Sequence, residues 1–473
     1  MRSSLLAILA FPASSALNGF FARAPVRSAC MRAGTVHMGR FDAPGSAPDD
    51  RRAKEIAFSE WLEANGVRLS AESGWGRAAH PLRVEADTVE DFELSGRGLI
   101  ARKEILQGEA IVKIPSSLVM TKRTAQQTLG REMVPDSLGE YLALALLLIH
   151  ERSLGADSVW APYIDILPTA EEVGQTWLWD EEDLSLLEGS SVVGSTASLR
   201  AKIDGEYASL ASGVLAACGL DLSVYSLPAF EWAMSMLLSR AIDLRETSEL
   251  ALVPYADLLN HSPYCSSYFF YQTVPLSDQR EVVLYADRSY AKNDQVLISY
   301  GQKSNAELLL LYGFVVDRNL YDEVELLVGL ADDDPRREEK AAYLASSGLK
   351  TQMAFPLLVD RFSAELLQYL RLCCVAPTDG PLDGYAYNQR ISVANERAAQ
   401  GALRDGCTAA LQAYPQTEAE DAALMENGRL FAALSRNQRM AVKLRRNEKR
   451  ILMRTIRACD TALEALDASP ISL

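Results

Sequence analysis

The sequence is poor in the residue patterns that bind metals. It contains only four histidines and seven cysteines in 473 residues. No two cysteines stand at Cys-x-x-Cys spacing, and no two histidines are paired at metal-ligand spacing. These absences argue against a thiolate zinc site and against a disulfide framework, so we expect no structural or catalytic metal. An odd number of unpaired cysteines also favours a reducing compartment.

The chain also lacks an excess of positive charge. Its formal net charge is −16, which argues against a nucleic-acid-binding protein, because such proteins usually carry a basic surface. The apolar run Leu142–Ile149 spans eight residues, which is too short to cross a bilayer and predicts a core helix. No internal repeat or low-complexity block is present. We expect a monomer with no stable membrane association.

The first 41 residues contain no Asp, Glu or Lys but five Arg. A positive charge at Arg2 precedes a short apolar run, Leu5–Phe11, and then small residues, which is the order of a signal peptide. The acid-free, Arg-bearing segment that follows is typical of a transit peptide. We expect residues 1–41 to be a targeting presequence, with the plastid as destination and the cytosol or mitochondrion as alternatives. Residues 42–52 are expected to form a linker.

The next part of the chain mixes strand and helix patterns. A short amphipathic helix is predicted over Ala53–Ala64, and two strands are predicted within Ser95–Pro115, around a turn at Gln107-Gly108. Helical patterns then dominate, with predicted helices within Tyr141–Gly155, Thr196–Gly219 and Ser226–Leu244.

Strand patterns return at Arg280–Ala286 and Gln295–Ser299. Ser304 and Glu307 are spaced as a capping box, which predicts a helix over Asn305–Tyr312 that ends at Gly313. After residue 332 the pattern is almost entirely helical. We therefore predict the α+β class: a β-rich domain with a helical insertion, followed by a separate all-α C-terminal domain.

Three motifs in this order resemble a known family. They are Gly-Arg-Gly-Leu at residues 96–99, Asp-Leu-Leu-Asn-His at 257–261 and the segment from Ser299 to Phe314. Together with the helical insertion and the helical tail, they resemble the SET-domain methyltransferases, and specifically the plant Rubisco large-subunit lysine methyltransferase group. The resemblance implies a SET domain over about 53–330, with its insertion at about 126–244, and a helical substrate-binding domain over 331–473.

The resemblance also implies an activity. It suggests a protein-lysine N-methyltransferase that uses S-adenosyl-L-methionine and acts on a folded, plastid protein such as Rubisco large subunit or fructose-bisphosphate aldolase. Two alternatives stay open: a SET-type methyltransferase of another target, including actin histidine or a lysine of ribosomal or elongation factors, and an interaction module that binds the cofactor without turnover.

The family motifs assign expected roles to residues near the methyl group. Tyr300, at a strand end before a glycine, is the expected catalytic tyrosine and also borders the cofactor. Asn260 and His261 match the family's cofactor-binding pair, and Asp257 either contacts the cofactor or stabilises its loop. Because a single histidine is more often a hydrogen-bonding group than a base, we expect His261 to orient the loop.

The remaining expected site residues come from other parts of the chain. The cofactor loop is Gly96, Arg97, Gly98 and Leu99, where glycine permits close approach of the backbone to a ligand. Arg240 is expected to pair with the cofactor carboxylate through its planar fork. Tyr312 and Phe314 are expected beside the cofactor, and Tyr312 also at the lysine channel, where aromatic faces attract a methylated ammonium.

One charged segment has no assigned role. The helix predicted over Arg436–Arg457 carries nine Lys or Arg and one Glu. It is expected to form a solvated face, to meet an acidic partner, or to meet the acidic stretch Glu418–Asp421.

Overall fold

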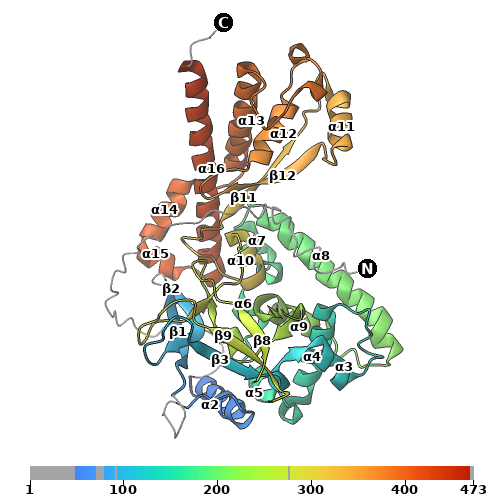
Figure 1. Cartoon of the computed structure of the whole chain (residues 1–473), viewed down its shortest axis with the longest axis vertical. Helices are drawn as coiled ribbons and strands as arrows, with labels where there is room; N and C mark the ends of the chain where they lie inside the picture. The colour runs from blue at the N-terminus through green and yellow to red at the C-terminus, as the bar shows by residue number, and fades with distance from the viewer. Residues whose placement is uncertain (1–47, 71–78, 91–92, 245, 275–276, 469–473) are drawn as a thin grey trace.

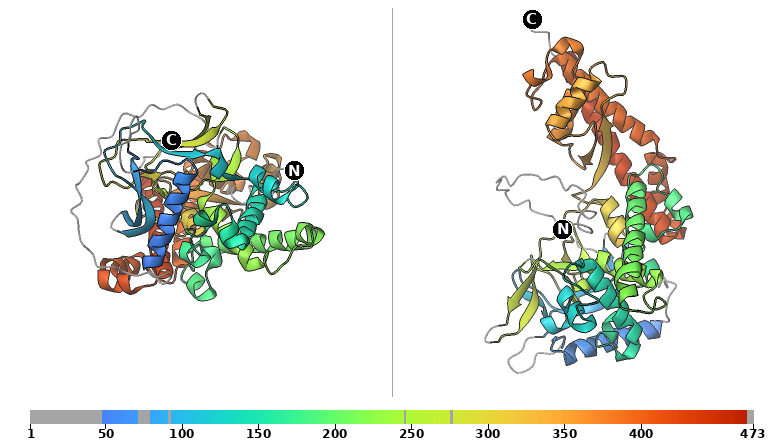
Figure 2. Two further views of the ribbon diagram at one scale, coloured as in Figure 1. Left: turned by 90° about the horizontal axis from the view of Figure 1, so that it is seen from below. Right: turned by 90° about the vertical axis from the view of Figure 1, so that its right-hand side faces the viewer.

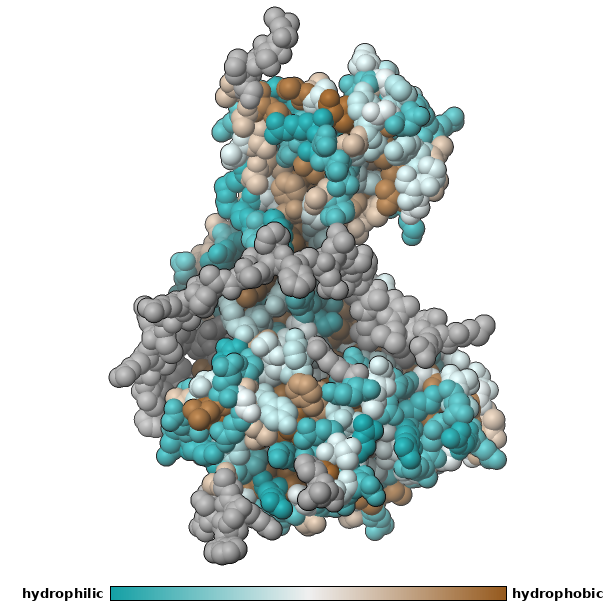
Figure 3. Space-filling view, viewed as in Figure 1, coloured by the Kyte–Doolittle hydropathy of each residue, from teal (hydrophilic) through white to brown (hydrophobic). Residues whose placement is uncertain are grey.

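The chain folds into two lobes stacked along its long axis (Figure 1). The computed structural model describes residues 48–70, 79–90, 93–244, 246–274 and 277–468. Each lobe has its own hydrophobic core, and the last helix contributes residues to both. The side view in the right panel of Figure 2 shows that the lobes are joined along one side of the molecule. On the face shown in Figure 3, hydrophilic residues predominate and hydrophobic residues form small separate patches.

The lower lobe is built on short strands in small sheets. The sheet orders are β1-β2, β3-β9-β8, β4-β6-β5 and β10-β7, and all pairs are antiparallel except β7 with β10. The strands are β1 Leu82–Glu90, β2 Glu93–Ala101, β3 Ala110–Pro115, β4 Met120–Thr121, β5 Ile242–Leu244, β6 Glu249–Leu252, β7 Asn260–His261, β8 Phe269–Thr273, β9 Arg280–Tyr285 and β10 Leu297–Ile298.

Helices cover these sheets and form the insertion between β4 and β5. The α-helices are α2 Pro48–Ala64, α3 Lys122–Leu129, α4 Glu140–Leu154, α5 Ala161–Ile164, α6 Ala170–Val173, α7 Glu181–Ser185, α8 Val192–Leu210 and α9 Leu227–Arg240. Shorter elements are η1 Ser116–Leu118, η2 Gly155–Asp157, η3 Thr176–Leu178, the π-helical η4 Ala211–Leu215 and η5 Ala256–Leu258. As predicted, α4 is a core helix, with Leu142 to Ile149 all buried. Within the described residues, no helix is long and apolar enough to cross a membrane.

Several boundaries differ from the sequence prediction. Helix α2 begins at Pro48, so the expected linker 42–52 is wrong in its last residues, and 42–47 lie outside the described part. The two strands predicted around Gln107-Gly108 exist as β2 and β3, but each pairs with a different partner. Helix α9 ends at Arg240, and the chain continues as β5 where a helix was expected. At the start of α2 and at the end of α9, the helical pattern of the sequence does not show where the helix stops. Contacts with other segments fix these boundaries.

Helix α10, Asn305–Tyr312, matches its prediction at both ends. Ser304 accepts a hydrogen bond from the Glu307 N–H, and Glu307 accepts one from the Ser304 N–H. Gly313 ends the helix in the left-handed region, with φ 76°. A side chain at position 313 would meet the Val173 carbonyl at 1.9 Å, so both the backbone conformation and the packing require glycine there.

The upper lobe is helical except for one two-stranded sheet. Strands β11 Glu323–Gly329 and β12 Gln352–Leu358 pair antiparallel. The helices are α11 Arg337–Ser346, α12 Ala364–Cys373, α13 Val393–Gln412, α14 Glu418–Glu426, α15 Gly428–Ala433 and α16 Arg436–Ala468, with short turns η6 Pro377–Asp379 and η7 Leu382–Gly384. The α+β class and the helical C-terminal region agree with the prediction. The expectation of an all-α C-terminal domain is wrong, because β12 lies within it and pairs with β11, and neither strand was predicted.

Part of the basic segment of α16 is paired with acidic side chains of the same chain. Arg445 and Lys449 both pair with the buried Asp421, and Arg446 pairs with Glu418. The acidic stretch on α14 is therefore its partner, as one of the sequence alternatives proposed. Since both sides of these contacts are buried or half-buried, they fix α14 against α16.

One acid on the same helix joins the two lobes. Glu448 is fully buried and accepts hydrogen bonds from Ser190 of the insertion, at 2.7 Å, and from Tyr414, at 3.0 Å. Burial raises the pKa of Glu448 to about 8, against the opposing effects of these hydrogen bonds and of Lys449. The neutral acid is therefore the form that the folded protein favours.

This raised pKa predicts a pH-dependent stability. Between the unfolded pKa of 4.5 and the folded value of about 8, the folded state binds more protons than the unfolded state, so stability is full below the unfolded pKa and falls as pH rises through the folded one. At roughly 1.36 kcal/mol per pH unit, ionisation of Glu448 lowers the free energy of unfolding by up to about 2.7 kcal/mol over two pH units of that window. Glu448→Gln, which mimics the neutral acid, should flatten the fall in chemical-denaturation curves.

The matched control for this test is Glu418→Gln. Glu418 lies on α14 and pairs with Arg446 on α16. Its substitution should leave the pH dependence of the unfolding free energy close to that of the wild type. Equal pH slopes in the wild type and Glu448→Gln would contradict the assignment.

Candidate active site

The site is framed by the parallel pairing of β7 with β10. Asn260 lies opposite Leu297, and His261 lies opposite Ile298. The ladder continues through a hydrogen bond from the Ser262 N–H to the Ile298 carbonyl, at 2.9 Å. This pairing brings the predicted Asn-His motif beside the predicted tyrosine segment, although the two are separated by about forty residues.

Four aromatic rings gather at this crossing. Tyr300 stacks on His261 with ring centroids 5.1 Å apart and on Tyr312 at 4.9 Å. Phe314 lies edge-on to Tyr300 at 6.4 Å and to Tyr312 at 6.2 Å, and tilted to His261 at 6.2 Å. We call His261, Tyr300, Tyr312 and Phe314 the aromatic cluster. The structure thus brings together four residues that the sequence predicted to share a site.

Hydrogen bonds fix the two central rings. The Tyr300 hydroxyl donates to the Leu259 carbonyl at 2.7 Å, and the Tyr300 N–H donates to His261 Nδ1 at 3.0 Å. Because Nδ1 accepts, the proton of the neutral ring resides on Nε2. Burial lowers the pKa of His261 to about 4. The ring is therefore neutral at physiological pH and is a weak base, in agreement with an orienting role.

The predicted cofactor loop is tied directly to Asn260. The Asn260 side-chain amide donates to Thr88 Oγ1, to the Arg97 carbonyl and to Gln295 Oε1, at 3.1, 3.3 and 2.9 Å. A side chain at Gly98 would approach Asn260 Nδ2 and Gln295 Oε1 to 2.8 Å. Glycine at 98 therefore allows the loop to pack against Asn260.

Arg240 and Asp257 form the other wall. Arg240 Nη1 lies 3.1 Å from the Asp257 carbonyl and 3.5 Å from its carboxylate, which also accepts from the Tyr163 hydroxyl at 2.8 Å. Burial raises the pKa of Asp257, and the Arg240 charge opposes that rise. Arg240 Nε, Asp257 Oδ1 and His261 Nε2 are buried without a hydrogen-bond partner in the part of the chain that the structure describes. Such atoms call for a ligand or water.

Two of the predicted loop residues point elsewhere. The Arg97 side chain pairs with Glu55 of α2 at 3.1 Å and donates to the Ile166 carbonyl. Leu99 is fully buried in the core of the lower lobe. Only the backbone of these two residues is therefore available to line the loop, because their side chains hold the loop to its surroundings.

Sequence reasoning missed the residues that brace the site. Thr88 and Gln295 orient Asn260, and Tyr163 holds Asp257. Tyr255, which precedes η5, is buried and has φ 73°, a strained conformation for a residue with a side chain. Thr88 and Tyr163 lie 172 and 94 residues from their partners, so spacing could not reveal them.

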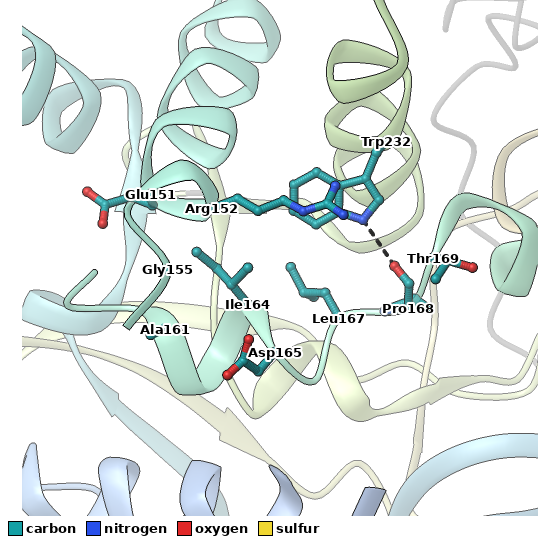
Figure 4. Close-up of a pocket in the computed structure, with 10 residues that line it drawn as sticks. All are labelled: Glu151, Arg152, Gly155, Ala161, Ile164, Asp165, Leu167, Pro168, Thr169 and Trp232. Atoms are coloured by element: carbon teal, nitrogen blue, oxygen red, sulfur yellow. Dashed lines mark hydrogen bonds between the residues drawn. The ribbon is translucent and has the colours of Figure 1, made fainter. Parts of the chain in front are cut away.

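A separate cavity lies in the insertion and contains none of the predicted site residues. It has a volume of about 210 Å³, and Figure 4 shows its wall between α4, α5 and α9. Arg152 lies over the Trp232 ring at 4.2 Å, and Trp232 donates to the Pro168 carbonyl. The Glu151 carboxylate in its wall accepts a hydrogen bond from Ser158. In the described residues, no group of three or more His, Cys, Asp or Glu side chains could hold a metal ion.

The close packing at Gly98 yields a prediction. In Gly98→Ala, the new methyl group would displace Asn260 and Gln295, at a cost of about 1–3 kcal/mol in the free energy of unfolding. We expect affinity for S-adenosylhomocysteine to fall about tenfold or more, because a tenfold loss needs only about 1.4 kcal/mol. Isothermal titration calorimetry measures the affinity. Gly194→Ala, on α8 with open space around the new methyl group, is the control and should bind normally.

Comparison with known proteins agrees with this geometry. Residues 96–301 match the SET domain family model, and residues 331–452 match the model described as Rubisco LSMT substrate-binding. The chain is 31% identical over 412 residues to a chloroplastic [fructose-bisphosphate aldolase]-lysine N-methyltransferase of Arabidopsis thaliana, covering 84% of this chain and 80% of the relative. It is 29% identical over 377 residues to the chloroplastic Rubisco large subunit N-methyltransferase of Nicotiana tabacum, covering 76% and 74%.

A more distant relative and a solved structure complete the comparison. The actin-histidine N-methyltransferase of Callithrix jacchus is 28% identical over 403 residues, covering 79% of this chain and 65% of the relative. A crystal structure of the SET domain of LSMT bound to lysine and AdoHcy superposes with a TM-score of 0.71 at 29% identity, covering 88% of this chain and 93% of that one. The chain therefore belongs to the SET-domain protein methyltransferases that carry a Rubisco LSMT substrate-binding domain.

Proposed function

We propose that the protein is an S-adenosylmethionine-dependent lysine N-methyltransferase of a folded plastid protein. Rubisco large subunit and fructose-bisphosphate aldolase are the candidate substrates, since relatives that share these two domains are named for them. The aromatic cluster is the observation that supports this proposal most directly. Stacked electron-rich rings attract a methylated ammonium by cation–π interaction and exclude water from it.

The walls of the site fit the cofactor. Its amino-acid part has a carboxylate and an ammonium, and the unpartnered Arg240 Nε and Asp257 Oδ1 are a matching donor and acceptor. The glycine loop at 96–98 leaves room for close backbone approach. When bound, S-adenosylmethionine supplies a methyl group on a positively charged sulfur. Asn260 holds the loop against this region through its three hydrogen bonds.

Tyr300 is the proposed catalytic residue. Its hydroxyl donates its proton to the Leu259 carbonyl, so the oxygen can present lone pairs to an electron-poor methyl group. A free lysine has a pKa of about 10.4 and must lose its proton before it can attack. Desolvation beside Tyr312 and Phe314 favours the neutral amine. The neighbouring His261 is too weak a base to serve, so loss of the proton depends on this environment.

The two lobes have separate proposed tasks. The SET domain, about 53–330 with its insertion at about 126–244, holds the chemistry. The C-terminal domain, 331–473, binds the folded substrate and presents its lysine. Residues 1–41 deliver the chain to the plastid, and the chloroplastic names of the relatives support that destination. The proposal includes a monomer that binds no nucleic acid.

The catalytic assignment predicts the effect of Tyr300→Phe. Removing one hydroxyl that stabilises charge in a transition state commonly lowers kcat about 100- to 1,000-fold. We expect a loss of that size in labelled-methyl transfer to plastid extract, with the affinity for S-adenosylhomocysteine within about threefold of the wild type. Tyr264→Phe, which removes the hydroxyl of an exposed tyrosine outside the aromatic cluster that donates to the Arg318 carbonyl, is the matched control and should be fully active.

The acceptor is tested with purified proteins. Rubisco, fructose-bisphosphate aldolase and actin are incubated with the enzyme and labelled cofactor, and the modified residue is located by mass spectrometry. Methyl-lysine on Rubisco or aldolase supports the proposal. Methyl-histidine on actin would instead establish the histidine alternative, and cofactor binding without labelling of any protein would favour the interaction-module alternative.

A further inference from the structure

The first residue of α16 reaches from the C-terminal domain to the aromatic cluster. Arg436 Nη2 donates to the Gly313 carbonyl at 3.0 Å, and Nη1 donates to the Glu172 carbonyl. Gly313 is the residue between Tyr312 and Phe314. A single guanidinium therefore holds the backbone that links two rings of the cluster and, at the same time, the end of α6 in the insertion.

The packing at this point leaves little freedom. A side chain on Gly313 would lie 1.9 Å from the Val173 carbonyl, and one on Gly174 would lie 2.9 Å from Arg436 Nη1. Two glycines from different segments thus approach closely, and the guanidinium lies directly against one of them. The Gln175 side chain also donates to the Leu311 carbonyl, so the last carbonyls of α10 are held by donors from two directions.

The chemistry of these contacts suits arginine in particular. The carbonyls at a helix C-terminus carry partial negative charge and lack partners in the helix. A planar guanidinium can donate to two separated carbonyls at fixed angles, whereas an ammonium is a point charge that cannot span both. The position of Gly313 is consequently set by the C-terminal domain as well as by the SET domain.

We infer that Arg436 is a positioning residue that sets the rings of Tyr312 and Phe314 for methyl transfer. The inference rests on the proposed function, because those rings line the proposed lysine channel. It also makes the junction between the two domains part of the active-site wall. A displacement of the first turn of α16 would reach the channel through Arg436.

Hydrogen–deuterium exchange on the full chain tests the inference without relying on turnover. In Arg436→Met, the amides of residues 308–315 should exchange about 10- to 100-fold faster, since a hydrogen bond to a charged group contributes about 1.5–3 kcal/mol. Its kcat for methyl transfer to the acceptor protein should fall about 100-fold, the loss expected from a small misplacement of reacting groups. Arg436→Lys should lie between Arg436→Met and the wild type.

Asn437→Ala is the matched control. Asn437 is the next residue and bonds Asp183 across the same junction, through Nδ2 to Oδ2 at 2.6 Å, whereas the Gly313 carbonyl accepts its hydrogen bond from Arg436. It should weaken thermal stability as much as Arg436→Met while leaving exchange at 308–315 and kcat near the wild type. Unchanged exchange in Arg436→Met, or equal losses in both variants, would overturn the inference. If the wild type transfers no methyl group, the proposed function fails and the exchange data alone decide this inference.

Discussion

The parallel pairing of β7 with β10 is the contact on which the site depends. It consists of only two residue pairs and the hydrogen bond that follows them. Parallel strands need a long connection between them, and here that connection includes β8 and β9, which form a sheet with β3. The pair therefore exists only when the rest of the lobe is folded. Because β7 and β10 pair over so few residues, the geometry of the cofactor loop beside them depends on the packing of the whole domain.

The site also depends on polar groups whose hydrogen bonds hold the backbone in place and take no part in a reaction. Asn260, His261 and Asp257 each make contacts that hold another segment in place. Burial of these groups is costly unless they are hydrogen-bonded. Asp257 Oδ1 and His261 Nε2 have no hydrogen-bond partner among the described residues, and they are the atoms that these residues offer to a ligand. Polar atoms that have hydrogen-bond partners therefore support the site, and polar atoms that lack them are candidates to bind a ligand.

Local patterns in the sequence predicted the local elements well. Ser304, Glu307 and Gly313 defined both ends of α10, and the uninterrupted apolar run in α4 correctly predicted a buried helix, because capping and periodicity act within one turn. The motifs also predicted which residues meet at Tyr300, through the family resemblance. Strands β11 and β12 were missed because each pairs with the other across the connection that contains α11, so neither is evident from its own segment. Thr88, Tyr163 and Arg436 were missed as site residues because their contacts are made only in the tertiary structure. The roles assigned to the site residues stay predictions.

The length of α16 has a mechanical consequence. At 33 residues and 1.5 Å per residue, it is a rod about 50 Å long. Its first turns are held in the lower lobe by the contacts of Arg436 and Asn437 and by core residues from Met440 to Leu444. A tilt of about 5° around that end moves the far end by roughly 4 Å but hardly displaces the pivot. The upper lobe can therefore adjust to the contours of a large folded substrate while the rings around Tyr300 keep their spacing. A long helix that is held at its first turns can therefore combine a variable position of the substrate-binding lobe with a fixed geometry at the site of methyl transfer.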